Sequence, residues 1–139
     1  MKKFITAIIA VIMAATMVLG MTACGATPEE KLKNYIESET FQSQLDTYKT
    51  SFGSTLDIDV KAEDNKVVYE FAYKTQIEEN VLDSVKEQLE TSFNSMSSTY
   101  EDIANDLKND LKIDDPVVVI KLLNADGTTI TELSFEATE

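Results

Sequence analysis

Apolar residues at helical spacing predict two consecutive helices that begin near position 28. Leu32 and Ile36 share one face of the first helix, whereas the apolar residues within 41–52 follow a nearly opposite face. One straight helix cannot bury two opposite faces in one core, so we expect a break or kink at 38–40. The segment 27–30, Thr-Pro-Glu-Glu, is a strong helix start, because its threonine can cap the first turn and its last glutamate completes a capping box.

The next pattern is an alternation of apolar and polar residues, which predicts a β-hairpin. Apolar residues occupy every second position of 56–62 and again of 67–73. A turn at 64–65 pairs Val60 with Tyr69 and places the alternating apolar residues of both strands on one face of the hairpin.

A second helical stretch and a second hairpin follow. One apolar face continues over 81–111, and the polar run 92–99, which has low helix propensity, is expected to interrupt it. The residues at 117–120 are apolar on both faces, which favours a central strand. The segment 124–127, Asn-Ala-Asp-Gly, suits a hairpin turn and fails the spacing of a calcium-binding EF-hand loop. A final strand is expected at 130–135.

The two halves of this pattern, about 28–75 and 80–136, have the same order of elements and a few matching residues, which indicates an internal duplication. We therefore expect a single α+β domain over 28–139, made of two similar helix-helix-strand-strand halves related by a pseudo-twofold axis. In this arrangement a four-stranded antiparallel sheet forms, with the helices packed on one face.

An export leader precedes this domain. Lys2 and Lys3 are followed by sixteen apolar or small residues at 4–19, a length typical of a signal peptide and short for a membrane-spanning helix. The only cysteine, Cys24, comes directly after two small residues. Residues 19–25 resemble the lipobox of bacterial lipoproteins, except that Met21 stands where the lipobox usually has leucine.

The lipobox resemblance implies a processing route and a location. Residues 1–23 are expected to be a removed signal peptide, Cys24 to carry a diacylglyceryl anchor, and 24–27 to be a short tether. The domain would then lie at the extracellular face of the cell membrane. Ordinary secretion and an uncleaved anchor are the alternatives.

Composition narrows the functions open to the chain. Removal of the leader takes away two lysines and no acidic residue. The remaining chain then has 10 lysines and 25 carboxylates, which gives a net charge of −15. The chain has no arginine, histidine or tryptophan. Without arginine and with so many carboxylates, we expect no nucleic-acid partner. Without histidine, the usual catalytic triads and zinc sites are excluded.

Two groups of residues are candidates for chemistry. Asp57 and Asp59 lie on one strand face, with Glu70 expected opposite Asp59, and clustered carboxylates can bind a divalent cation; a solvated strand face is the favoured interpretation. The tyrosines could form a binding stripe, although their spacing favours positions at the edge of the core. They are Tyr35, Tyr48, Tyr69, Tyr73 and Tyr100.

The mature chain also resembles a family of small Gram-positive lipoproteins, of clostridial type, known only as a domain of unknown function. The segments 41–45, 57–60 and 116–127 carry this resemblance, which implies a location and no activity. We expect a non-enzymatic lipoprotein without cofactors that makes protein–protein or envelope contacts. A divalent-cation-binding module is the alternative, and a small carbohydrate-active enzyme is a weaker one. The oligomeric state is left open.

Overall fold

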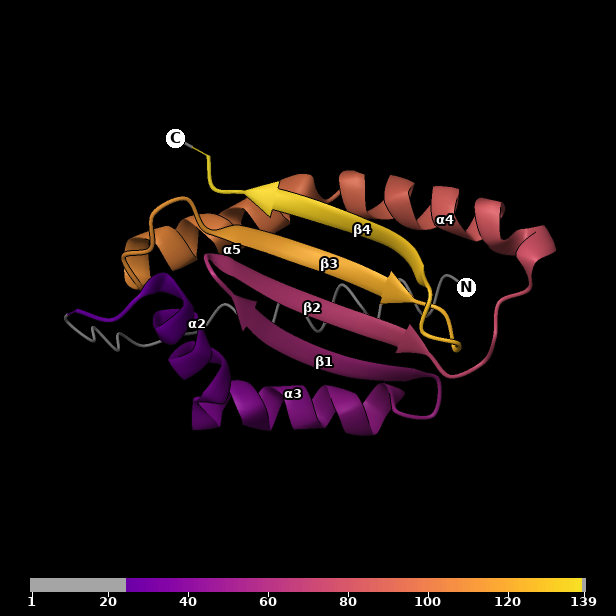
Figure 1. Ribbon diagram of the computed structural model, residues 1–139, viewed down its shortest axis with the longest axis horizontal. Coiled ribbons are helices and arrows are strands. Elements are labelled where there is room, and N and C mark those ends of the chain that lie inside the picture. The colour runs from indigo at the N-terminus through magenta and orange to yellow at the C-terminus, as the bar shows by residue number, and fades with distance from the viewer. Residues whose placement is uncertain (1–24, 139) are drawn as a thin grey trace.

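The computed structural model describes residues 25–138, which form helices and strands in the order α-α-β-β-α-α-β-β (Figure 1). The helices are α2 (Pro28–Glu37), α3 (Glu39–Phe52), α4 (Glu79–Asn94) and α5 (Ser97–Asp110). The strands are β1 (Leu56–Glu63), β2 (Lys66–Tyr73), β3 (Val117–Leu123) and β4 (Thr129–Glu136). Within 25–138, no helix combines the length and the apolar character needed to span a bilayer.

The first helix begins and ends as the sequence predicts. Thr27 Oγ1 accepts a hydrogen bond from Glu30 N at 3.2 Å, and Glu30 Oε2 accepts one from Thr27 N at 2.8 Å, which completes the capping box. Ser38 ends α2 and caps α3, because its hydroxyl oxygen accepts a hydrogen bond from Phe41 N. The predicted break at 38–40 is therefore confirmed.

The long helical stretch is also interrupted where its polar run predicts. α4 ends at Asn94 and α5 begins at Ser97. The two helices continue in nearly the same direction, so that together they run back along the length of the sheet (Figure 1). As a result, the chain enters β3 at the same end of the sheet at which it entered β2.

The strands lie in the order β1-β2-β3-β4. β1 and β2 are antiparallel with Val60 opposite Tyr69, so the predicted register of the first hairpin is confirmed. β3 and β4 are antiparallel as well. β3 has a neighbour on each side, as expected for a strand that is apolar on both faces. In the second hairpin, Gly127 has a φ of 86°, the left-handed conformation that a glycine adopts without strain.

The prediction of an entirely antiparallel sheet is wrong. β2 and β3 pair in parallel, with Tyr69 beside Ile120, and the sheet is therefore mixed. The cause is the return path through α4 and α5, since a crossover connection that brings the chain back to the starting end of the sheet produces a parallel pair.

The predicted arrangement of two similar halves is wrong for the same reason. A twofold axis normal to the sheet would exchange β1 with β4 and β2 with β3, and it would make β2 and β3 antiparallel. A duplication of the half-chain, however, would match β1 with β3 and β2 with β4. The observed strand order and the parallel pair do not fit this symmetry.

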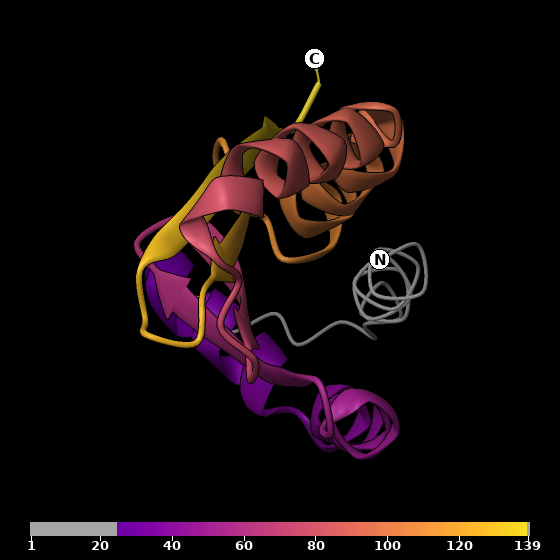
Figure 2. The ribbon, with the colours of Figure 1, turned by 90° about the vertical axis from the view of Figure 1, so that its right-hand side faces the viewer.

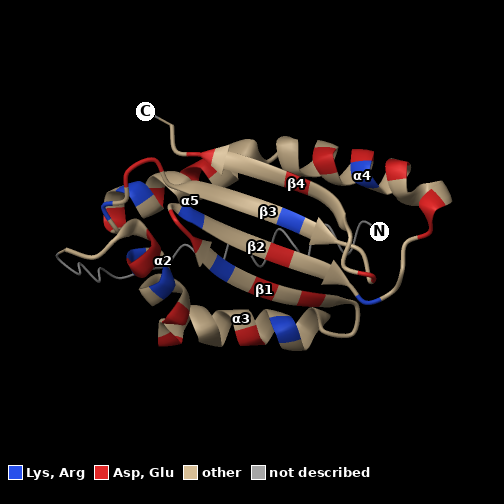
Figure 3. Ribbon diagram, viewed as in Figure 1, with Lys and Arg blue, Asp and Glu red and all other residues tan. Residues whose placement is uncertain are grey.

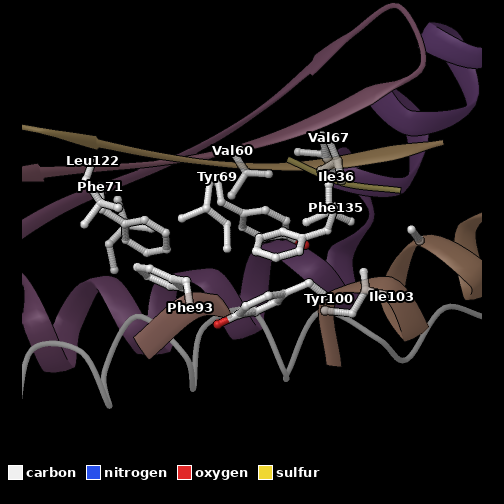
Figure 4. Close-up of a cluster of buried hydrophobic side chains, with 14 of the residues drawn as sticks. Ile36, Val60, Val67, Tyr69, Phe71, Phe93, Tyr100, Ile103, Leu122 and Phe135 are labelled. Carbon is white, nitrogen blue, oxygen red and sulfur yellow. The ribbon is translucent and has the colours of Figure 1, made fainter. Parts of the chain in front are cut away.

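The core lies on one face of the curved sheet, which we call the inner face. α3, α4 and α5 lie on that side (Figure 2), while α2 and α3 pack against β1 and α5 packs against β3 and β4. Figure 4 shows Tyr69, Phe71 and Leu122 pointing from the strands toward Phe93 and Tyr100 on the helices. All five of these side chains are fully buried.

Candidate functional site

Cys24, the predicted lipidation site, lies outside the described residues, as does the leader 1–23. The structure begins with the tether residues 25–27, which lead directly into α2. The predicted acylation of Cys24 therefore stays a prediction.

The opposite face of the sheet, which we call the outer face, is the candidate site. Figure 1 looks onto this face, and no helix of residues 25–138 lies over it (Figures 1 and 2). The strand register places four rows of side chains across it from β1 to β4. The rows are Glu63, Lys66, Val117 and Glu136; Lys61, Val68, Val119 and Ser134; Asp59, Glu70, Lys121 and Glu132; and Asp57, Ala72, Leu123 and Thr129.

An apolar strip occupies the centre of the outer face, along the parallel pair β2–β3. Val68 and Val119 form its floor, with only 6% and 4% of their surface exposed. Val117 extends the strip at one end, and Ala72 and Leu123 lie beyond the charged pair Glu70 and Lys121, which divides the strip; all three are half-buried. We call these five residues the outer strip. Parallel strands are normally covered on both faces, so an apolar strip on an uncovered face is unusual.

Charged residues lie on all four strands of the sheet, on β1 and β4 beside the outer strip and on β2 and β3 within its length (Figure 3). On β1, Lys61 Nζ lies 3.5 Å from Glu70 Oε2 and 3.7 Å from Asp59 Oδ2. Lys121, on β3, is the register partner of both Glu70 on β2 and Glu132 on β4. Acidic residues outnumber lysines on this face by six to three, so its rim is negative overall.

The predicted carboxylate cluster is thus only partly assembled. Asp59 and Glu70 are cross-strand partners as expected, but the ammonium group of Lys61 lies within reach of both carboxylates. Asp57 forms a separate ion pair with Lys74 at 3.2 Å. Among residues 25–138, no group of three or more potential ligands has the geometry to hold a metal ion.

The tyrosines do not form an exposed stripe. Tyr35, Tyr69, Tyr73 and Tyr100 are buried in the core, and only Tyr48 is half-buried, stacked on Phe52. Tyr100 packs on Phe135, with ring centroids 4.6 Å apart. The hydroxyl groups of Tyr73 and Tyr100 are buried and have no hydrogen-bond partner in the described part of the chain.

Burial changes the acidity of these tyrosines. It is the main cause that raises the pKa of Tyr35, Tyr69, Tyr73 and Tyr100 above the ordinary value. The carboxylate of Asp106 further raises the pKa of Tyr35. The four phenols are therefore neutral at physiological pH and serve as core residues with a polar tip.

One structural element was missed by the sequence reasoning. Asn124, only 3% exposed, accepts a hydrogen bond from Ile77 N at 2.8 Å and donates one to Ile77 O at 3.0 Å. Beside it, Gln76 and Asp126 exchange two further hydrogen bonds. We call these contacts the loop clasp. It ties the β2–α4 connection to the β3–β4 turn, and an asparagine that directly follows an apolar strand was its only signal in the sequence.

Comparison with known proteins identifies the family and nothing beyond it. No curated protein and no solved structure matches the chain. The family described as "Domain of unknown function (DUF4854)" matches residues 32–135, which extend from the middle of α2 to the end of β4. Because this match covers most of the chain, the protein belongs to the DUF4854 family of unknown function.

Proposed function

We propose that this protein is a Gram-positive lipoprotein held at the extracellular face of the cell membrane by a diacylglyceryl group on Cys24. Its domain acts as a non-enzymatic interaction module. The contact surface is the outer strip together with its charged rim.

The observation that carries this proposal is the layout of the outer face. Interfaces of soluble proteins commonly combine an apolar centre with a polar rim. The outer strip supplies such a centre, and the carboxylates of β1 and β4 supply the rim. By charge complementarity, the fitting partner is an envelope protein with an apolar ridge flanked by lysine or arginine.

The position of Lys61 favours this proposal over a divalent-cation module. A cation between Asp59 and Glu70 would have to displace the ammonium group that now lies near both carboxylates. The pair also lacks the third and further oxygen ligands that calcium requires.

Site-specific photo-cross-linking in the native membrane tests the contact surface. A photoreactive residue in place of Val117 lies in the outer strip. The matched control replaces Val81, an apolar residue on α4 that is 45% exposed. We expect an adduct of defined mass from position 117 and none from position 81. The charge change Glu132→Lys should weaken that adduct, whereas Glu87→Lys on α4 should leave it unchanged. Equal adducts from both positions, or none from position 117, would refute the contact surface.

Metabolic labelling with a fatty acid tests the anchor separately. The wild-type protein should incorporate the label, and Cys24→Ala should not. Undiminished labelling of Cys24→Ala would show that the anchor is attached elsewhere or that the label is not specific.

A further inference from the structure

We infer that the end of the sheet with the β1–β2 turn faces the membrane, and that the β3–β4 turn is the part of the domain farthest from the lipid. This inference rests on the proposed acylation of Cys24. It assigns the lipid surface as the neighbour of one defined end of the domain.

The first turn of α2 is fixed to that end by two hydrogen bonds. Asp64 N in the β1–β2 turn donates to Glu29 Oε2 at 3.1 Å, and Lys31 Nζ donates to the carbonyl oxygen of Lys112 at 2.8 Å. Asn65 in the same turn donates to the α5–β3 connection. The start of α2, the β1–β2 turn and the α5–β3 connection therefore form one unit, at the left end of Figure 1.

The tether is too short to separate this unit from the acyl chains. Three residues, 25–27, lie between Cys24 and Pro28, and Thr27 is already fixed by the capping box. Even when fully extended, the chain from Cys24 to Pro28 spans only about 14 Å. The strands are 7 or 8 residues long, so the β3–β4 turn lies about 25 Å farther along the sheet.

The charge of the domain opposes lying flat on an anionic membrane. The outer face has six carboxylates against three lysines, and α4 and α5 together have eight against two. Neither broad side therefore attracts anionic headgroups. Repulsion acts within a Debye length of about 10 Å at 0.1 M salt. A uniformly acidic body tethered at one end is pushed upright by this repulsion, and higher salt should weaken the effect.

Single-cysteine labelling of the lipidated protein in vesicles tests the orientation. Asn109→Cys, at the exposed end of α5, reports on the proposed membrane-facing end, and Ala125→Cys, in the β3–β4 turn, reports on the far end. Because the acylated Cys24 cannot react, each introduced cysteine is the one reactive thiol. A fluorophore on each position is then exposed to a quencher carried on the headgroups of vesicles that contain phosphatidylglycerol.

At 0.1 M salt we expect strong quenching of the fluorophore at position 109 and little quenching of the fluorophore at position 125. Equal quenching at both positions would mean that the domain lies flat, and stronger quenching at 125 would mean that it is inverted; either result overturns the inference. If the purified protein carries no acyl group and does not bind the vesicles, the proposed anchor itself is wrong. The two failures are thus distinguishable.

Discussion

Truncation of the Asn124 side chain should destabilise the domain by about 2–3 kcal/mol. The side chain is buried in the loop clasp, and Asn124→Ala removes its hydrogen bonds with Ile77 N, Ile77 O and Ala125 N. Each such bond contributes about 0.5–1.5 kcal/mol, and a half-buried backbone group left unpaired adds to the loss. For a domain of this size the loss corresponds to a decrease in Tm of roughly 10 °C.

Thermal and urea unfolding monitored by circular dichroism provide the measurement. The matched control is Gln76→Ala, which removes the exposed hydrogen bonds of the same loop clasp and should have a small effect. Asn124→Asp adds a second check. Its carboxyl can donate to Ile77 O only when protonated, so this variant should recover stability relative to wild type as the pH falls.

A free energy of unfolding for Asn124→Ala within about 0.5 kcal/mol of wild type would contradict this prediction, because a buried backbone group that loses its hydrogen-bond partner costs more than that. A loss of stability in Gln76→Ala equal to that in Asn124→Ala would contradict it as well, because the exposed and buried contacts would then be equivalent.

Three further predictions concern charge and protonation. Glu70→Lys should cost about 0.5–1 kcal/mol in urea unfolding, because it replaces the partner of Lys61 with a second ammonium group, and Glu70→Gln should cost less; a stabilised Glu70→Lys would refute the pairing. The four buried tyrosines hold their protons more tightly in the folded state than in the unfolded state, whose phenols ionise near pH 10.0. Their contribution to the free energy of unfolding should therefore be constant below that pH and decrease above it. Replacement of all four by phenylalanine should make this decrease smaller. The Tm should rise between low and moderate NaCl as the repulsion among 25 carboxylates, against 10 lysines in residues 25–139, is screened; an unchanged Tm would contradict this.

The local elements could be predicted because their signals are local. The capping box at Thr27, the break at Ser38 and the alternation around Val60 each depend on residues within one or two turns of helix or strand. The turn that contains Gly127 could be predicted for the same reason, because glycine adopts the left-handed conformation of this position without strain.

The parallel pairing of β2 and β3 could not be predicted from local sequence signals, because it depends on the end of the sheet at which α5 ends. Two helices joined by a sharp reversal would have returned the chain to the far end of the sheet and produced an antiparallel pair. α4 and α5 instead share one buried face, from Val85 to Leu107, and continue along the sheet. The sequence shows that shared face, but it does not show in which direction α5 continues after the interruption at 92–99. The similar order of elements in the two halves indicated an antiparallel sheet instead.

The candidate site likewise combines contacts within one hairpin, which the sequence predicts, and contacts between residues far apart in the sequence, which it does not. The row that joins Asp59 and Glu70 follows from the first hairpin, and it was predicted. The outer strip requires the parallel pair, because only that pairing places Val68 beside Val119. The ion pair between Lys61 and Glu70 could not be predicted in the same way, because it depends on the side-chain conformation of Lys61 in the folded sheet.

The inner face of the sheet stabilises the fold, whereas the outer face is the proposed contact surface, so substitutions on the two faces should have different effects. Glu70 and Phe71 are adjacent in the chain, yet the pleat sends Phe71 into the core and Glu70 to the outer face. A change at Phe71 must therefore affect folding, whereas a change at Glu132, on the same outer face as Glu70, can alter the rim and leave the core intact. If substitutions on the outer face abolish partner binding and leave the Tm nearly unchanged, the uncovered face has a function of its own. If every such substitution lowers the Tm and the binding in proportion, the outer strip is a structural part of the sheet and the contact surface lies elsewhere.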